Sequence, residues 1–521
     1  SICDPVPVAL AAELTARDDA GNVLDRLEQQ TSLVTTSGPG RDAYQVQALL
    51  RTHLVADLQR HGLRRVADLH AAAARWWAAQ DEPLRALEHA THGHDQALLI
   101  DLLHRFAIRL ILAGDHGPLQ RAIARVDAQD TTADPWLLLA SALTHLDAGE
   151  RAAAHKDLHH AQLLWPAHGG SDLAVLCGVV EQLGADPTDP TLPADANIDE
   201  LPAQPELEAL ARLGRGDACL QHDDREGAGA EFGAALALSR RYGFDYLRMQ
   251  CFSLLGVVAW RGGDLPTMRT MSEEALGVAA DRSWDGSRWS QAATAMTGYS
   301  ELLRCLPADA ERRTADALGA GTVAAPEVRF ALQAIHGAAV FDLGDRAEGL
   351  AQLQRARSDF GANQARAQLC AAMAMLEYRA ALLLGHAAAA RTVLGWLSER
   401  CGDHAELVVM RAWADTAAGH PAHARAALRA VLDGSTPVLL PQTVVGVWLL
   451  EGSIALAAGG GPAARHALQT ALALAGPLDA LRPFTQAGPN IPDLLVHQHG
   501  SFGASEVLVN RVLAIGVGHQ R

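Results

Sequence analysis

The feature that most constrains this chain is a recurring three-residue mark: a small or apolar residue, a glycine, and a residue able to begin a helix. Adjacent marks stand about 34 to 41 residues apart where the series is unbroken, which is the length of a helix–turn–helix repeat. Glycine permits the left-handed turn that ends one helix, and an acidic residue after it can cap the next. The glycines of the mark are Gly114, Gly149, Gly263, Gly344, Gly385, Gly419 and Gly460. The series predicts helix after helix from about residue 81 onward.

The apolar residues between these marks recur at helical spacing. One face is formed by Leu247, Cys251, Leu254, Leu255 and Val258, and the next by Leu265, Met268, Met271, Ala275, Leu276 and Ala279. Such spacing indicates amphipathic helices. Because a pair of helices cannot bury such faces alone, neighbouring pairs are expected to stack into a solenoid.

The first eighty residues follow another pattern. Residues 7–16 and about 20–30 read as short helices, with Asp18 and Asp19 available to cap the second. Two β-prone stretches, 32–34 and 44–46, flank the glycine- and proline-rich turn 37–40, which predicts a hairpin. Helices are expected at 47–60 and 63–80. Together these elements predict a winged-helix-like module.

The predicted fold class is therefore all-α: a TPR-like helical-repeat superhelix preceded by a small winged-helix-like module. Residues 184–205 hold five prolines and five acidic residues, which favours a solvated loop or linker over a binding motif. The expected domains are the winged-helix-like module (1–80), a first repeat half (81–183), the linker (184–205), a second array (206–480) and a C-terminal helical tail (481–521).

Charge argues against direct nucleic-acid binding by this chain. The formal net charge is −17, and Lys156 is the single lysine, whereas a nucleic-acid surface needs clustered cations. No glycine-rich stretch precedes Lys156, so a phosphate-binding P-loop is excluded from the sequence. Neither a G-x-S-x-G nor an H-E-x-x-H motif occurs, and we expect a chain without enzymatic activity.

The histidines and cysteines are better explained by structure than by metal binding. His155, His159 and His160 form one cluster, and His89, His92 and His94 form another. Neither comes with the third converging ligand that a zinc site needs, so exposed helix-surface histidines are favoured and no metal is expected. The seven cysteines are widely spaced without a C-x-x-C pair, which suits reduced thiols in the cytoplasm. No apolar run is long enough to span a membrane.

Aromatic and cationic residues gather within about two repeats of a chain that has only 5% aromatics. Rings and guanidinium groups on a concave helical wall can stack on and hydrogen-bond a sugar, a nucleotide or an acidic metabolite. The alternative is a purely structural role, in which the tryptophans fill wide gaps between helices. The candidate ligand-binding residues are Arg248, Trp260, Arg261, Trp284, Arg288, Trp289, Tyr299 and Arg304. Packing is expected of the isolated Trp136, Trp165, Trp396, Trp413 and Trp448.

An ordered set of short motifs resembles the MalT-type regulators, large ATP-binding members of the LuxR family. In the opening hundred residues the matching positions are Cys3-Asp4, Leu14-Thr15, Asp19-Ala20, Leu24 and Leu27, Tyr44-Gln45-Val46-Gln47, Leu49-Leu50-Arg51, Leu69-His70, Ala73, Trp76-Trp77, Ala86, and His89-Ala90. Near the other end they are Ala471, Leu474-Ala475, Pro477 and Leu481-Arg482-Pro483-Phe484, which are similar to the family's segment just before its DNA-binding domain.

The resemblance implies a parent with an ATP-binding module, a winged-helix module, a TPR-like sensor array and a C-terminal helix-turn-helix. This chain departs from the pattern at Gln47, where the family usually has histidine. It opens with Ser1 inside the winged-helix region and stops without the helix-turn-helix, so we expect a fragment. No cofactor is expected in this chain, because ATP would belong to the NTPase domain of the parent.

What carries over is the sensor role. We expect the effector-sensing and signal-relay region of a bacterial transcription regulator, which binds a small-molecule inducer or a partner protein on its superhelix. Other expected partners are the adjoining NTPase domain, DNA only through the helix-turn-helix, and a second copy of the chain if it oligomerises. The alternative is a protein–protein interaction scaffold without a small effector. An all-helical enzyme is the least favoured interpretation.

Overall fold

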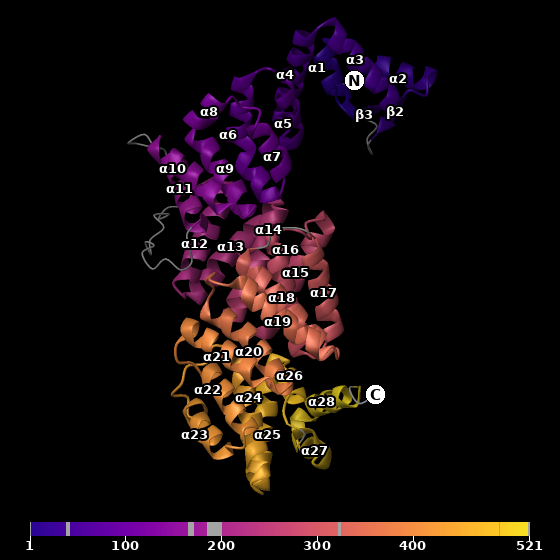
Figure 1. Ribbon diagram of the computed structural model, residues 1–521. Coiled ribbons are helices and arrows are strands. Elements are labelled where there is room, and N and C mark those ends of the chain that lie inside the picture. Colours follow the sequence, from indigo (N-terminus) through magenta and orange to yellow (C-terminus); the bar gives the residue numbers. More distant parts are fainter. Residues whose placement is uncertain are drawn as a thin grey trace. The chain divides into compact units, whose positions relative to one another are not determined.

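A computed structural model describes residues 2–37, 42–164, 171–184, 201–320, 325–488 and 490–518. The chain divides into two compact units (Figure 1). The first comprises residues 1–184, 195–214 and 238–247, and the second comprises residues 185–194, 215–237 and 248–521. The described residues form helices and one small sheet, which confirms the all-α class. No helix among them is long and apolar enough to cross a membrane.

The N-terminal module has the predicted helices and hairpin, together with one strand that the sequence did not indicate. Its antiparallel sheet has the order β1-β3-β2, with Val34 opposite Val46 and Val6 opposite Tyr44. β1 was assigned to the start of a helix because a strand of two residues has no periodicity to detect. The elements are β1 (Val6–Pro7), α1 (Val8–Thr15), α2 (Ala20–Gln30), β2 (Val34–Ser37), β3 (Ala43–Val46) and α3 (Ala48–His61).

The module has a small core and polar ties between its helices and sheet. Leu10 and Tyr44 are buried, and the Tyr44 hydroxyl donates to the Asp25 carboxylate of α2. The predicted cap of α2 is wrong: Asp19 makes no side-chain bond to the helix amides. Its carboxylate instead accepts two bonds from Arg17, at 2.8 and 2.9 Å. A neighbouring guanidinium thus replaces the amide as partner.

The remaining helices of the first unit begin at Leu63. Three later helices contribute residues to both units: α12 (Pro205–Gln221), α13 (Arg225–Tyr242) and α14 (Asp245–Arg261). Most of the predicted linker, residues 185–200, lies outside the described residues, and the predicted domain boundaries stay predictions. The helices of the first unit after α3 are α4 (Leu63–Ala79), α5 (Pro83–His92), α6 (Gln96–Ala113), α7 (His116–Ile123), α8 (Ala128–Ala133), α9 (Pro135–Asp147), α10 (Arg151–Leu163) and α11 (Ser171–Gly184).

The second unit consists of helices joined by short turns. From α14 onward they are α14 (Asp245–Arg261), α15 (Leu265–Arg282), α16 (Arg288–Leu303), α17 (Pro307–Gly319), α18 (Pro326–Asp342), α19 (Arg346–Phe360), α20 (Ala367–Leu383), α21 (Ala387–Cys401), α22 (Ala405–Ala417), α23 (Pro421–Leu432), α24 (Pro441–Ala457), α25 (Gly461–Leu478), α26 (Arg482–Thr485), α27 (Asn490–His497) and α28 (Glu506–Gly518).

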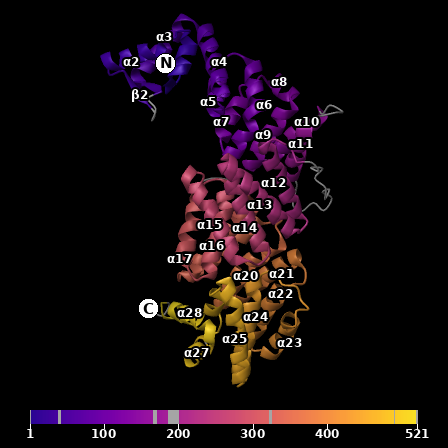
Figure 2. The same ribbon diagram turned by 180° about the vertical axis from the view of Figure 1, so that it is seen from behind.

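The packing within this unit is that of stacked helix pairs. α18 packs against α19, α20 against α21, α22 against α23, and α24 against α25. The first helices of successive pairs, from α16 through α24, also pack each against the next. This confirms the predicted repeat architecture: each pair shares its apolar face with a neighbour. α26, α27 and α28 follow the last pair and pack on α24 and α25 or on one another (Figures 1 and 2).

The glycine marks end helices as predicted, except for Gly460, which begins α25 as its N-cap while Gly459 takes the left-handed φ of 78°. Gly114, Gly344 and Gly419 have φ of 91°, 115° and 82°, in the left-handed region that side chains with a Cβ rarely adopt. The prediction that the acidic residue after the glycine caps the next helix is confirmed at two of the marks. Asp345 accepts a bond from the Glu348 amide at 3.3 Å, and Asp264 caps α15 in the same way.

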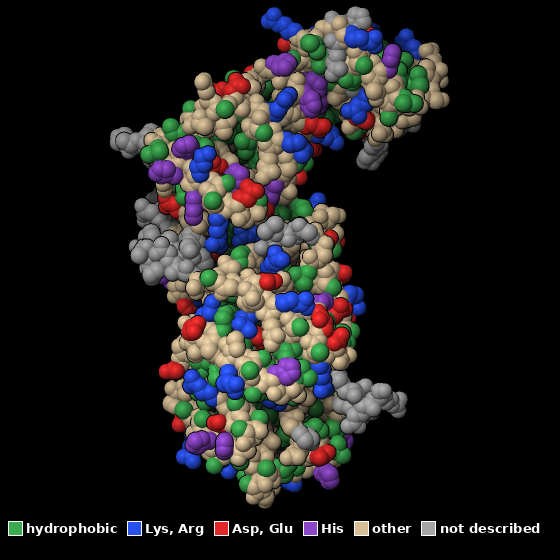
Figure 3. All heavy atoms as spheres, in the orientation of Figure 1, with side chains coloured by type: hydrophobic (Ala, Val, Ile, Leu, Met, Phe, Trp, Pro, Cys, Tyr) green, Lys and Arg blue, Asp and Glu red, His purple; other side chains and the backbone are tan. Residues whose placement is uncertain are grey.

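The surface carries both signs of charge. On the face shown in Figure 3, basic and acidic side chains are interspersed over the helices of both units.

A close helix crossing generates the first prediction. A Cβ added at Gly349 of α19 would lie 2.5 Å from the Phe341 nitrogen and 2.7 Å from the Gly337 oxygen of α18. Gly349→Ala should therefore lower the free energy of unfolding by about 1–3 kcal/mol, the range for overpacking. The matched control is Gly395→Ala in α21, where a Cβ meets nothing within 4 Å. That variant should be more stable by about 0.5–1 kcal/mol. Urea denaturation measures both, and equal shifts would contradict the prediction.

Candidate functional site

The eight residues predicted to form a ligand site do not converge on one cavity. Arg261, at the end of α14, has a side chain only 7% exposed and donates to the Leu220 carbonyl and, at 2.5 Å, to Asp223. Burial lowers the pKa of its guanidinium. The adjacent Trp260 packs against the core, and its carbonyl accepts a bond from Gln368 at 3.1 Å. Both residues hold neighbouring helices together.

The predicted residues around α16 contact different groups. The Arg288 guanidinium lies 4.6 Å from the ring centroid of Trp289, and the Trp284 carbonyl accepts a bond from Ser290 at 2.9 Å. Arg248 belongs to α14, one repeat earlier. Arg304 donates to Asp479 at 2.7 Å.

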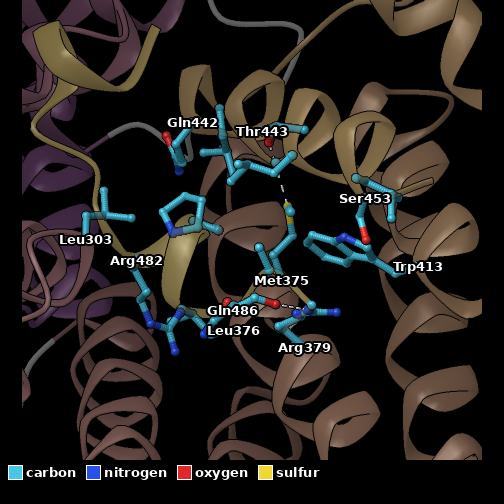
Figure 4. Close-up of a pocket in the computed structure, with 18 of the residues that line it drawn as sticks. Leu303, Met375, Leu376, Arg379, Trp413, Gln442, Thr443, Ser453, Arg482 and Gln486 are labelled. Atoms are coloured by element: carbon cyan, nitrogen blue, oxygen red, sulfur yellow. Dashed lines mark hydrogen bonds between the residues drawn. The ribbon is translucent and has the colours of Figure 1, made fainter. Parts of the chain in front are cut away.

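Of the eight, Tyr299 belongs to the lining of a cavity inside the second unit. The cavity has a volume of about 260 Å³ and is bounded by α16, α20, α22, α24, α26 and the chain that follows α26 (Figure 4). The Tyr299 hydroxyl accepts a bond from Gln442 at 2.7 Å, and burial raises its pKa. The apolar lining comes from Leu303, Ala372, Met375, Leu376, Trp413, Leu440, Leu449, Leu450 and Pro483.

Arg379 is the cation that faces this cavity. It extends from α20, and its guanidinium carbon lies 5.0 Å from the ring centroid of Trp413 on α22. One terminal nitrogen donates to the carbonyl of Gln486, whereas the buried Nε has no hydrogen-bond partner within the part of the chain that the structure describes. Burial and the charge of Arg482 lower the pKa of Arg379 to about 10. The group stays protonated at neutral pH.

The second arginine at the cavity is already neutralised. Arg482 of α26 donates from Nε to Asp342 at 2.7 Å and from Nη2 to the same carboxylate at 3.2 Å, and its side chain is 7% exposed. Bidentate geometry of this kind makes a strong, directional ion pair. Asp342 is the last residue of α18, so the pair fixes α26 to the repeat array.

The Thr443 hydroxyl of α24 serves structure rather than an open site. Thr443 donates to the buried carboxylate of Glu406 at 2.9 Å, and the amides of Leu439 and Leu440 donate to the same group at 3.2 and 2.9 Å. Gly446 of α24 faces the Trp413 ring, and a Cβ added there would be in ordinary van der Waals contact with the ring, at 3.7 Å. Ser453 points its hydroxyl toward the cavity (Figure 4).

Sequence reasoning missed the residues that distinguish this cavity. Arg379, Trp413 and Arg482 belong to three helices separated by tens of residues, and neither composition nor local spacing brings them together. Trp413, which was expected only to pack, forms a wall of the cavity as well. The available signal was the Leu481-Arg482-Pro483-Phe484 motif, which had been noted for family resemblance and not as part of a site.

The N-terminal histidines form a cluster of a different membership from the one predicted, in which His89 is buried, His70 is partly buried and His92 is exposed. His89 contacts His70 at 2.9 Å through the Nδ1 atoms and Cys3 at 3.4 Å through Nε2, and His92 stacks on His70. Burial lowers the pKa of both His70 and His89 to about 4. His94 is exposed. In the described residues, no three or more His, Cys, Asp or Glu side chains are placed to hold a metal ion.

Comparisons with known proteins support the resemblance of the opening residues to MalT. Residues 1–66 match the family model of the MalT winged helix domain. A 139-residue stretch is 25% identical to the HTH-type transcriptional regulator MalT of Vibrio parahaemolyticus. The match covers 27% of this chain and 15% of that regulator, so the chain spans much less than two thirds of its relative.

Among solved structures, the chain is similar to two helical-repeat proteins. One is a Rap protein complexed with competence and sporulation factor, at 13% identity, with 75% of this chain and 100% of that chain covered and a TM-score of 0.41. The other is a signal transduction ATPase with numerous domains from Pyrococcus horikoshii that has a tetratricopeptide repeat sensor. It shows 13% identity, coverage of 75% of this chain and 63% of that one, and a TM-score of 0.42.

The buried pair at α26 gives a stability prediction. Asp342→Asn should lower the free energy of unfolding by about 3–5 kcal/mol, because it leaves the Arg482 charge buried without its partner. The control is Asp309→Asn, which breaks an ion pair with Arg312 whose side chains are 43% and 65% exposed. Its effect should stay under about 0.5 kcal/mol. Chemical denaturation measures both variants. A loss of less than about 1 kcal/mol for Asp342→Asn would contradict the stabilising role of the Arg482–Asp342 pair.

The histidine cluster predicts a pH dependence in α4 and α5. The folded pKa of about 4 lies below the ordinary 6.5, so the unfolded chain binds more protons between these values. Stability is therefore complete above pH 6.5 and is lost as the pH falls toward 4. The loss from pH 7 to 5 should be about 1 kcal/mol per histidine. Hydrogen-exchange protection of α4 and α5, corrected for intrinsic rates, measures it. His70→Gln should remove roughly half of the effect, and an unchanged slope would refute the assignment.

Proposed function

We propose that this chain is the effector-sensing and signal-relay region of a MalT-like transcription regulator, and that the cavity in the second unit holds a small-molecule inducer. The proposal draws on the MalT winged helix match at residues 1–66 and on the repeat array of the second unit. The observation that carries it is the cavity itself, where Tyr299, Arg379 and Trp413 from three different repeats meet the segment that follows the array. The role is binding and relay, without catalysis.

The position of the cavity suggests how binding would be relayed. Its wall includes Arg482, Pro483 and Gln486, which lie in and just after α26 and lead into α27. An inducer in contact with this segment would favour one arrangement of α26 over another, and only such a preference can shift a population. α28 is coupled to the same region through Asp479, which accepts from Arg511 at 2.8 Å and from Arg304 at 2.7 Å.

The remaining parts of the proposal concern the parent protein. The winged-helix module would relay the change to an adjoining NTPase domain, where ATP would bind, and DNA would be contacted through a helix-turn-helix. The seven cysteines are all free thiols, which fits a role in the cytoplasm. The competing role is a scaffold whose helical groove holds a protein and no small effector.

A cavity-filling variant tests the proposal. Ser453→Phe places a ring in the cavity, so an inducer that raises the melting temperature of the wild type should lose at least about tenfold in affinity for the variant. The control is Ser398→Phe, which adds the same ring at an exposed position of α21 and should bind normally. A thermal-shift screen of sugars, nucleotides and acidic metabolites supplies the compound, and calorimetry measures its affinity.

Two results would contradict this assignment. Equal affinity of the wild type and Ser453→Phe would place the binding site elsewhere. A melting temperature that responds to a protein partner and to no small molecule would favour the scaffold role instead.

A further inference from the structure

The charges around the cavity leave one cation without an acidic partner. Arg482 is paired with Asp342, and Glu377, which follows Leu376 on α20, is paired with Arg357 at 2.8 Å. Glu406 is occupied by the amides of residues 439 and 440 and by Thr443. The charge that acts most strongly on Arg379 is another cation, Arg482. Glu377 on α20 and Glu406 on α22 thus already have partners.

The Arg379 guanidinium has more N–H donors than hydrogen-bond acceptors around it. It offers five N–H donors and cannot be deprotonated near neutral pH, yet Arg379 donates a hydrogen bond to a backbone carbonyl, that of Gln486, and not to a carboxylate. Its buried Nε has no partner in the described part of the chain. A buried cation without a counter-ion is destabilising, and an anionic ligand would remove that penalty.

The residues around Arg379 hold its guanidinium in one orientation, and they favour a ligand with an apolar body. Trp413 lies 5.0 Å from the Arg379 guanidinium carbon, and stacking on an aromatic ring holds a guanidinium while its N–H edge stays available for a carboxylate. Met375, Leu449 and Pro483 supply an apolar lining. The volume of about 260 Å³ is just below the usual range of small-molecule sites, roughly 300–1,000 Å³.

From this balance we infer that the ligand is a small apolar monocarboxylate: its carboxylate accepts from Arg379, and its hydrocarbon or aromatic body packs against Trp413 and Met375. One uncompensated cation matches one negative charge, so dicarboxylates and phosphate esters would bring a second charge into an apolar space. The inference rests on the proposed function, because it names the chemical class of the inducer for the same cavity.

The test compares matched acids and amides by calorimetry on the full chain. The probes are benzoate, phenylacetate and indole-3-acetate, each paired with its neutral primary amide. We expect each acid that binds the wild type to bind at least about tenfold more tightly than its amide, as for a hydrogen bond to a charged group. Phenyl phosphate should bind more weakly than phenylacetate.

A matched pair of variants locates the effect. Arg379→Met keeps an apolar side chain beside Trp413 and removes the charge, so the preference for acid over amide should disappear. The control is Arg400→Met. Arg400 also lies over a tryptophan, with its guanidinium carbon 4.4 Å from the ring of Trp396, and also donates to a backbone carbonyl, that of Gly361 at 2.9 Å. It does not line the cavity, so acid binding should be unchanged.

Each outcome decides one of the two proposals. Acids and amides that bind the wild type equally, or an acid preference that survives in Arg379→Met, would overturn the carboxylate inference and leave the cavity as a site for neutral inducers. If no probe binds, the carboxylate inference fails, and the screen with Ser453→Phe then decides the proposed function separately. The acid-to-amide ratio in the wild type is informative even if Arg379→Met fails to fold.

Discussion

The cavity depends on one buried ion pair, that of Arg482 with Asp342. The repeat helices alone leave the space between α20, α22 and α24 open on one side, and α26 covers it. Four residues of helix have little stability of their own, so α26 needs an anchor in the array. The bidentate pair to the end of α18 provides that anchor, and the same arrangement leaves Arg379 beneath α26 with the Gln486 carbonyl as its hydrogen-bond acceptor.

The fold was predictable where the determining interaction is local. Glycines such as Gly344 and Gly419 end helices because of their own backbone freedom. Apolar periodicity can be detected within the sequence of a single helix, so it also predicts helices locally. The strand β1 was missed because its two residues are defined by pairing with Tyr44 and Ala43, far along the chain. The Asp19 cap failed because Arg17 offers that carboxylate a charged partner in place of an amide.

The candidate site was not predictable for the same physical reason. Arginines and tryptophans that are close in sequence, such as Arg261 and Trp260, hold turns and helix pairs together, since residues of one repeat contact mainly their neighbours. A cavity within a solenoid takes one or two residues from each of several repeats. Arg379, Trp413 and Arg482 therefore carry no common pattern, and only Tyr299 belonged to both the predicted set and the observed lining.

The two arginines at the cavity show why charge balance is more informative than residue type. Arg482, in α26, is buried, whereas Arg379 is partly buried, with its Nε enclosed. Arg482 has a carboxylate in bidentate contact and so acts as a structural tie, whereas the strongest charge acting on Arg379 is a like charge. A protein that retains such a group gives up stability unless something compensates it. In a region whose proposed task is to respond to an inducer, that uncompensated charge is a means of coupling: the ligand that neutralises Arg379 also contacts the segment held by Arg482.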